Sequence, residues 1–80
     1  MQTELVLSAR ERLTLARRKA GLDQTAMAAL LGVTRPTISD YENGRSEPTL
    51  SKLVLWAEAA DVSLDWLCAR RDSNPQPSDP

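Results

Sequence analysis

The sequence predicts an all-α protein, and three observations support that fold class. Only three glycines and five prolines occur among 80 residues, phenylalanine is absent, and three of the prolines fall within 75–80. No stretch alternates apolar and polar residues with the β-branched enrichment typical of a strand. Serine, threonine or aspartate repeatedly precedes a segment with helical apolar spacing, and glycine often follows it. We therefore expect five helices and no sheet.

The first helix is expected to begin after Ser8. Ser8 and Glu11 have the spacing of a capping box, in which each side chain bonds the other residue's backbone N–H. Gly21 suits the left-handed conformation that ends many helices. The predicted inner stripe follows the i, i+3, i+7 pattern and comprises Leu13, Ala16 and Ala20.

The second helix is expected at about 24–31, between a capping Asp23 and a terminating Gly32. A threonine at 34 and a proline at 36 predict a third helix at 35–43, because the first turn of a helix tolerates proline. Gly44 is expected to end it. The side chains predicted to face inward are Met27, Leu30, Leu31, Ile38 and Tyr41.

The fourth helix is expected at about 50–60 after Thr49, and Asp61 occupies the position of a left-handed cap. Its predicted inner face has regular helical spacing and comprises Leu50, Leu53, Val54 and Ala57. Ser63 is expected to cap a short fifth helix. From Arg71 onward the sequence has no apolar residue except proline, so we expect a domain at 1–70 and a disordered tail at 71–80.

Residues 24–43 have the pattern of a helix-turn-helix. Ala28 supplies the small residue where two helices cross, and Gly32 supplies the turn. Apolar residues stand at the inward positions before, within and after that turn, namely Met27, Leu31, Val33, Ile38 and Tyr41. The alternative is an ordinary pair of helices joined by a glycine turn.

Several segments resemble the lambda-repressor-like (XRE/Cro type) DNA-binding family over about residues 8–70. They are Leu22-Asp23-Gln24, Leu31-Gly32-Val33-Thr34, Tyr41-Glu42-Asn43-Gly44-Arg45, Pro48-Thr49-Leu50 and Val62-Ser63-Leu64-Asp65-Trp66-Leu67. The resemblance implies a five-helix lambda-repressor-like domain that binds a palindromic operator as a dimer. The third helix, 35–43, would then be the recognition helix in the major groove.

The residues expected to read bases lie on the side of the third helix opposite its inward pair. Arg35 suits this role because a guanidinium can donate two hydrogen bonds to guanine. By resemblance, Arg35, Pro36 and Asp40 fall at base-facing positions, and Ser39 lies beside them. Asp40 has an equal alternative, as a surface carboxylate that orients Arg35 or excludes wrong bases.

Residues expected to contact phosphates flank the same helix. The resemblance places Gln24, Asn43 and Arg45 at such positions, and the hydroxyls of Thr34 and Thr37 are possible donors. Thr34 is equally consistent with a role as an N-cap alone. By resemblance, Arg17 pairs with Glu42 and braces the first helix against the third. The other basic residues of the first helix are expected to form a solvated face: Arg10, Arg12, Arg18 and Lys19.

Charge is unevenly distributed along a chain whose formal net charge is −1. Residues 10–52 hold eight basic and five acidic side chains, whereas residues 53–80 hold two basic and five acidic ones. The second segment is the candidate dimer interface, with Leu55, Trp56, Leu64 and Leu67 as its apolar residues. Alternatively, Trp56 and Trp66 fill a core that lacks phenylalanine, and Cys68 is a small hydrophobe rather than a redox switch.

Several function classes are excluded by composition. The absence of histidine and the single cysteine argue against a metal site, a cofactor site and an enzyme. No apolar run approaches the ~20 residues of a membrane helix, so a cytoplasmic protein is expected. We predict a sequence-specific transcriptional regulator of double-stranded DNA, a phage or prophage repressor of the Cro type. The alternatives are an antitoxin that also binds a toxin protein, and an interaction module that does not bind DNA.

Overall fold

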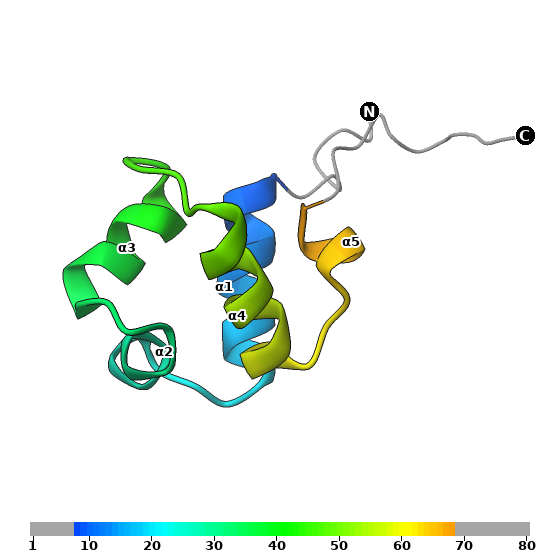
Figure 1. Cartoon of the computed structure of the whole chain (residues 1–80), viewed down its shortest axis with the longest axis horizontal. Helices are drawn as coiled ribbons and strands as arrows, with labels where there is room; N and C mark the ends of the chain where they lie inside the picture. Colours follow the sequence, from blue (N-terminus) through cyan, green and yellow to red (C-terminus); the bar gives the residue numbers. More distant parts are fainter. Residues whose placement is uncertain (1–7, 69–80) are drawn as a thin grey trace, which may run out of the picture.

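The computed structural model describes residues 8–68, and within them the chain forms five helices and no strand. The helices are α1 (Ala9–Lys19), α2 (Gln24–Leu31), α3 (Arg35–Asn43), α4 (Leu50–Ala60) and α5 (Leu64–Cys68). In Figure 1, α1 and α4 form the centre of the molecule, with α2 and α3 at one end and α5 at the other. The tail predicted at 71–80 and the domain limit predicted at 70 lie outside the described residues.

Local capping signals set the helix boundaries as the sequence predicted. Ser8 and Glu11 form the complete capping box, and the hydroxyl of Ser63 accepts a hydrogen bond from the backbone N–H of Trp66 at 3.0 Å. Gly32 ends α2 in the left-handed conformation. Asp61 does the same for α4 with φ of 58°, although it is not glycine.

The core lies where α1, α2, α3 and α4 meet, and α5 closes one end of it. Trp56 of α4 is fully buried, and its indole N–H donates to the carbonyl oxygen of Leu13 at 3.1 Å. This hydrogen bond satisfies the polar atom of the largest core side chain. The buried apolar residues are Leu13, Ala16, Met27, Ala28, Leu31, Ile38, Tyr41, Trp56, Ala57, Ala60 and Leu67.

Three residues predicted to face inward are exposed instead. Ala20 follows the last residue of α1 and serves as its C-cap, so it lies beyond the packed stripe. Leu30 is 55% exposed because only a narrow stripe of α2, which includes Leu31, is buried. Successive residues of a helix are about 100° apart around its axis, so Leu30 points away from that stripe. Leu50 is 66% exposed at the first position of α4, before the helix reaches the core.

No helix among residues 8–68 is long and apolar enough to span a membrane.

Candidate nucleic-acid interface

The helices α2 and α3 and the turn between them form a compact unit at one end of the molecule. Gly32 adopts φ of 73°, and the next residue, Val33, donates its N–H to the carbonyl oxygen of Ala28 at 3.0 Å. Thr34 then caps α3 by accepting a hydrogen bond from the N–H of Thr37. These bonds fix the direction in which α3 leaves the turn.

The inner side of α3 is anchored by two buried side chains. Ile38 is fully buried, and Tyr41 packs near Trp56 of α4, with ring centroids 6.4 Å apart and planes tilted by 58°. Since α1, α2 and α4 all pack around these residues, α3 cannot rotate about its axis without exposing them. Its outer side is consequently held in one orientation.

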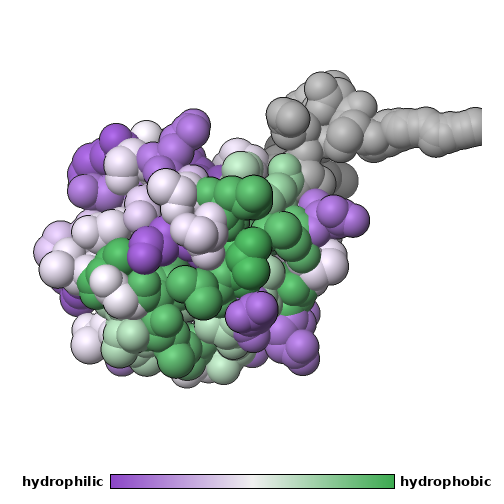
Figure 2. All heavy atoms as spheres, viewed as in Figure 1, coloured by the Kyte–Doolittle hydropathy of each residue, from purple (hydrophilic) through white to green (hydrophobic). Residues whose placement is uncertain are grey.

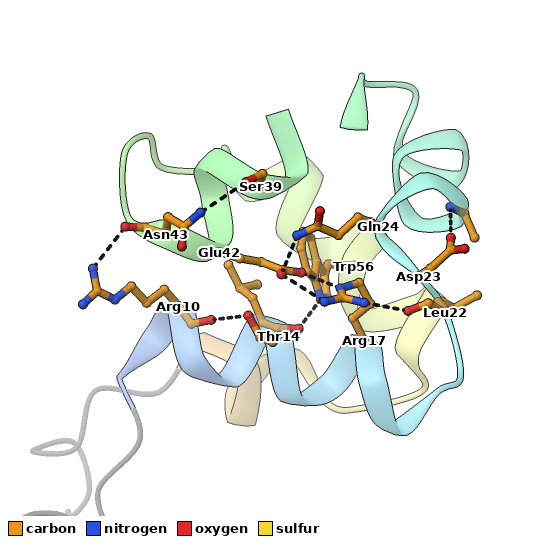
Figure 3. A network of polar contacts seen from close by, with 12 residues as sticks. Arg10, Thr14, Arg17, Leu22, Asp23, Gln24, Ser39, Glu42, Asn43 and Trp56 are labelled. Atoms are coloured by element: carbon orange, nitrogen blue, oxygen red, sulfur yellow. Dashed lines mark hydrogen bonds and ion pairs between the residues drawn. The ribbon is translucent and has the colours of Figure 1, made fainter. Parts of the chain in front are cut away.

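A buried polar cluster fixes the last turn of α3 against α1 (Figure 3). Arg17 donates from Nε and Nη2 to the two carboxylate oxygens of Glu42, at 2.6 and 3.1 Å. Gln24 donates from Nε2 to Oε1 of the same carboxylate at 3.1 Å, and Arg17 also donates to the carbonyl oxygen of Leu22 at 2.8 Å. The charged side chains are only 9% and 6% exposed. The structure thus brings Arg17, Glu42 and Gln24 together.

The charge state of Glu42 follows from this arrangement. Burial by itself raises the pKa of the Glu42 carboxyl, but hydrogen bonds from Arg17 and Gln24 and the charge of Arg17 outweigh it. The pKa of Glu42 therefore lies below its ordinary value, and the carboxylate is ionised at neutral pH.

The outer side of α3 carries the residues predicted to read bases. Arg35 and Pro36 are exposed at its start, and Ser39 and Asp40 are half-buried along the next turn. The Arg35 guanidinium makes no hydrogen bond to any of residues 8–68. Asp40 pairs with Arg45 at 3.4 Å in an exposed contact, and not with Arg35 as the alternative interpretation predicted. Arg45 immediately follows the turn that ends α3 and can reach back to Asp40, whereas Arg35 stands at the far end.

The residues predicted to contact phosphate lie at the ends of α2 and α3. The hydroxyls of Thr34 and Thr37 bond to each other at 3.0 Å. Asn43 donates from its amide to the hydroxyl of Ser39 at 3.1 Å, and Arg45 is exposed beyond it. Gln24 keeps one amide N–H free of Glu42. The side chains are grouped around α3, on the same end of the molecule.

Arg10 contributes to this region in a way that sequence reasoning missed. The sequence predicts that Arg10 belongs to a solvated face, but Arg10 donates to the carbonyl oxygen of Asn43 at 3.2 Å and lies over Gly44. A Cβ at Gly44 would stand 2.6 Å from the Arg10 guanidinium. Arg10 precedes Arg17 by seven residues, and this i, i+7 spacing was the available signal that both face α3.

Arg12 and Lys52 were also assigned no structural role. Arg12 donates to the carbonyl oxygen of Trp66 at 3.2 Å and lies 5.0 Å from the centre of its ring, which joins α1 to α5. Lys52 donates to the carbonyl oxygen of Leu31 at 3.1 Å and so caps the carboxyl end of α2. No local pattern in the sequence indicates these contacts.

The predicted dimer interface requires a correction. Trp56 and Leu67 are in the core, with exposed fractions of 0% and 1%, so neither can form a surface contact. Trp56 fills the phenylalanine-free core, as the alternative interpretation expected, and Trp66 is partly buried against that core. Leu64 is half-buried against the core, and Leu55 is exposed.

Comparison with known proteins gives a consistent result. A family model described as helix-turn-helix matches residues 13–67. The cryptic phage CTXphi transcriptional repressor RstR of Vibrio cholerae is 36% identical over 61 residues, which cover 76% of this chain and 54% of that protein. An uncharacterized HTH-type transcriptional regulator of Bacillus subtilis, YqaE, is 42% identical over 57 residues, 71% of this chain and 49% of its own. The chain spans about half the length of these curated relatives.

Among solved structures, the P22 c2 repressor protein in complex with a synthetic operator is similar to this chain. The TM-score is 0.73 at 28% identity, and the match covers 80% of this chain and 97% of that one. The five-helix arrangement is therefore that of a lambda-repressor-like domain.

Proposed function

This chain belongs to the helix-turn-helix family, and we propose that it is a sequence-specific regulator of transcription that binds double-stranded DNA through α3. The family and fold are those of DNA-binding regulators, which are not enzymes. We also propose a phage or prophage repressor of the Cro type; similarity to a phage repressor supports the repressor part of this assignment.

The observation that carries the proposal is the contrast between the two sides of α3. Its inner side is fixed by Ile38, Tyr41 and the buried Glu42. Its outer side presents Arg35, exposed and without a hydrogen-bond partner among residues 8–68, at the amino-terminal end of the helix. A helix enters the major groove with its amino-terminal residues against base edges, and a free guanidinium there can bind guanine O6 and N7.

The remaining outer residues have roles that follow from their chemistry. Pro36 can contact a thymine methyl group, and Asp40 can accept a hydrogen bond from cytosine N4. Arg45 is released for a phosphate when Asp40 turns to a base, because their contact is long and exposed. Gln24, Thr34, Thr37 and Asn43 would bind phosphates on either side of the recognition helix.

One helix-turn-helix contacts only a few base pairs, so useful affinity requires a second copy on a palindromic operator, with half-sites about one turn apart. We infer a homodimer on DNA for this reason. The antitoxin interpretation uses the same DNA contacts and adds a toxin protein as partner.

The proposal is tested by selecting duplexes from a random pool and measuring affinity for the selected and a scrambled sequence at two salt concentrations. Replacing Arg35 with alanine should weaken the selected site by about 1–3 kcal/mol and lower its preference over the scrambled site. Arg18→Ala is the matched control, because Arg18 is an exposed arginine on α1 and does not belong to the proposed recognition helix. Failure to select any sequence would refute DNA recognition, and an unchanged preference for Arg35→Ala would refute the assignment of Arg35.

A further inference from the structure

The outward face of α4 is more apolar than a solvent-exposed helix requires. Among residues 8–68, the exposed large apolar side chains are Leu15, Leu30, Leu50 and Leu55, and all but Leu15 belong to α4 or to the end of α2. Figure 2 shows hydrophobic residues gathered over α4 and the adjoining helices, while the area over α3 is mostly hydrophilic. Exposed apolar side chains on the outside of a helix are candidates for an interaction site.

Charges of opposite sign stand on either side of this face. Lys52, Leu55 and Glu58 follow one another at intervals of three residues in α4, so they form one row on its surface. The Lys52 ammonium has three N–H groups and donates one to the carbonyl oxygen of Leu31. The Glu58 carboxylate is exposed and has no hydrogen bond or ion pair to any of residues 8–68. Each end of the row thus retains bonding capacity.

The order of the row makes it complementary to itself. When a second copy is related to the first by a two-fold axis that passes beside Leu55 at right angles to the row, its row runs in the opposite direction. Lys52 of each chain then faces Glu58 of the other, and the two Leu55 side chains meet between the two ion pairs. Such a contact is isologous, because the same patch serves both chains, and its charges favour one alignment over others.

We propose that the row Lys52–Leu55–Glu58 of α4 is a self-association surface, occupied by a second copy of this chain. Lys52 also donates to the carbonyl oxygen of Leu31, so the start of the row adjoins the carboxyl end of α2. The row belongs to α4, whereas the residues proposed to read bases belong to α3, so the two surfaces are formed by different helices. The inference names a surface for the proposed homodimer but is tested without DNA, so either proposal can fail alone.

Sedimentation equilibrium over a concentration series measures the association directly. Lys52→Glu and Glu58→Lys should each raise the dimer dissociation constant about tenfold or more, since each turns two attractive pairs into two repulsive ones. The double variant, with both charges exchanged, should return to within about threefold of the original protein. Glu47→Lys makes the same change of charge as Glu58→Lys, but in an exposed loop, so it is the control and should leave the dissociation constant unchanged.

Lys52→Glu also loses the hydrogen bond from Lys52 to α2, so it could weaken association by disturbing the fold. A variant without a charge change separates the two effects. Leu55→Ser keeps that bond and should raise the dissociation constant about tenfold, because it removes both leucines from the apolar contact at the centre. Circular dichroism checks that each variant is folded. A wild-type protein that stays monomeric at about 100 μM, or single charge reversals that match the Glu47→Lys control, would overturn the proposal. A double variant that fails to regain association would refute the pairing of Lys52 with Glu58. If the protein is a monomer, a different protein would be the occupant of this face of α4, such as the toxin of the antitoxin interpretation.

Discussion

Replacing Glu42 with glutamine is the sharpest test of what holds α3 in place. Glu42 accepts two hydrogen bonds from Arg17 and one from Gln24. The glutamine side chain has nearly the same shape, but it is neutral and presents an NH₂ group where one carboxylate oxygen stood. At least one of these donors then faces another donor, and the buried Arg17 guanidinium loses its counter-charge.

The size of the effect can be estimated from the burial of the pair. Removing one partner of a buried ion pair costs about 3–5 kcal/mol. Arg17 keeps its hydrogen bond to Leu22, and glutamine keeps one acceptor oxygen, so we expect the free energy of unfolding to fall by about 2–3 kcal/mol. For a domain of this size, that corresponds to a decrease in Tm of about 10–20 °C.

Urea unfolding at pH 7, followed by circular dichroism, gives the free energy for Glu42→Gln, Arg17→Met and the double variant. The double-variant cycle should yield a coupling energy of at least about 1 kcal/mol. Asp40→Asn is the matched control, because the Asp40–Arg45 pair is exposed and should contribute under about 0.5 kcal/mol. If Glu42→Gln destabilises the protein no more than Asp40→Asn does, the cluster does not anchor α3.

Three further predictions concern the same scaffold. Because the pKa of Glu42 is lowered in the folded protein, its contribution to stability should be complete above the ordinary glutamate pKa of 4.5 and be lost as the pH falls through the lower folded value. Urea unfolding from pH 7 to 3 should show a smaller acid-dependent loss in Glu42→Gln than in the original protein, and equal losses would contradict the assignment. Gly44→Ala should lower the free energy of unfolding by more than Gly21→Ala: both glycines have φ of 78°, but only Gly44 lies under Arg10. Equal costs of about 1–2 kcal/mol would show that the Arg10 contact contributes nothing. Asp23→Ala should lower the free energy of unfolding by about 1 kcal/mol, because it removes the side-chain oxygen that accepts a hydrogen bond from the N–H of Ala26. Asp23→Asn keeps such an oxygen and should lower it little. If thermal unfolding gave the same Tm for both variants, this cap would not contribute to stability.

The sequence predicted the helices well because their ends depend on neighbouring residues. Ser8 finds its partner three residues away, and Gly32 and Asp61 need only their own backbone to adopt the left-handed conformation. The turn between α2 and α3 was predictable for the same reason. Interactions between residues this close in the chain can be predicted from a short window of a single sequence.

Errors arose where the outcome depends on residues far apart in the chain. Leu30 and Leu50 satisfy the helical pattern, yet the neighbouring helices do not cover them. Trp56 and Leu67 were placed in an interface, but the core needs their volume. Contacts such as those of Arg12 and Lys52 span 54 and 21 residues, and a charge pattern cannot reveal which distant carbonyl oxygen lies within reach.

The distribution of basic residues bears on how such a chain would bind DNA. The segment 10–52 has an excess of basic side chains, but Arg10, Arg12, Arg17 and Lys52 donate hydrogen bonds to the protein itself. These cations stabilise the fold and orient α3, and Arg45 is shared with Asp40. Arg17 is neutralised by Glu42, and the carbonyl contacts of the other three restrain their side chains, so we expect few phosphate contacts, each adding about 0.9 to the salt dependence of log K. Affinity that does not come from phosphates must come from base contacts such as that proposed for Arg35 and from a second copy, so a variant that cannot self-associate should lose more affinity for a palindrome than for a single half-site.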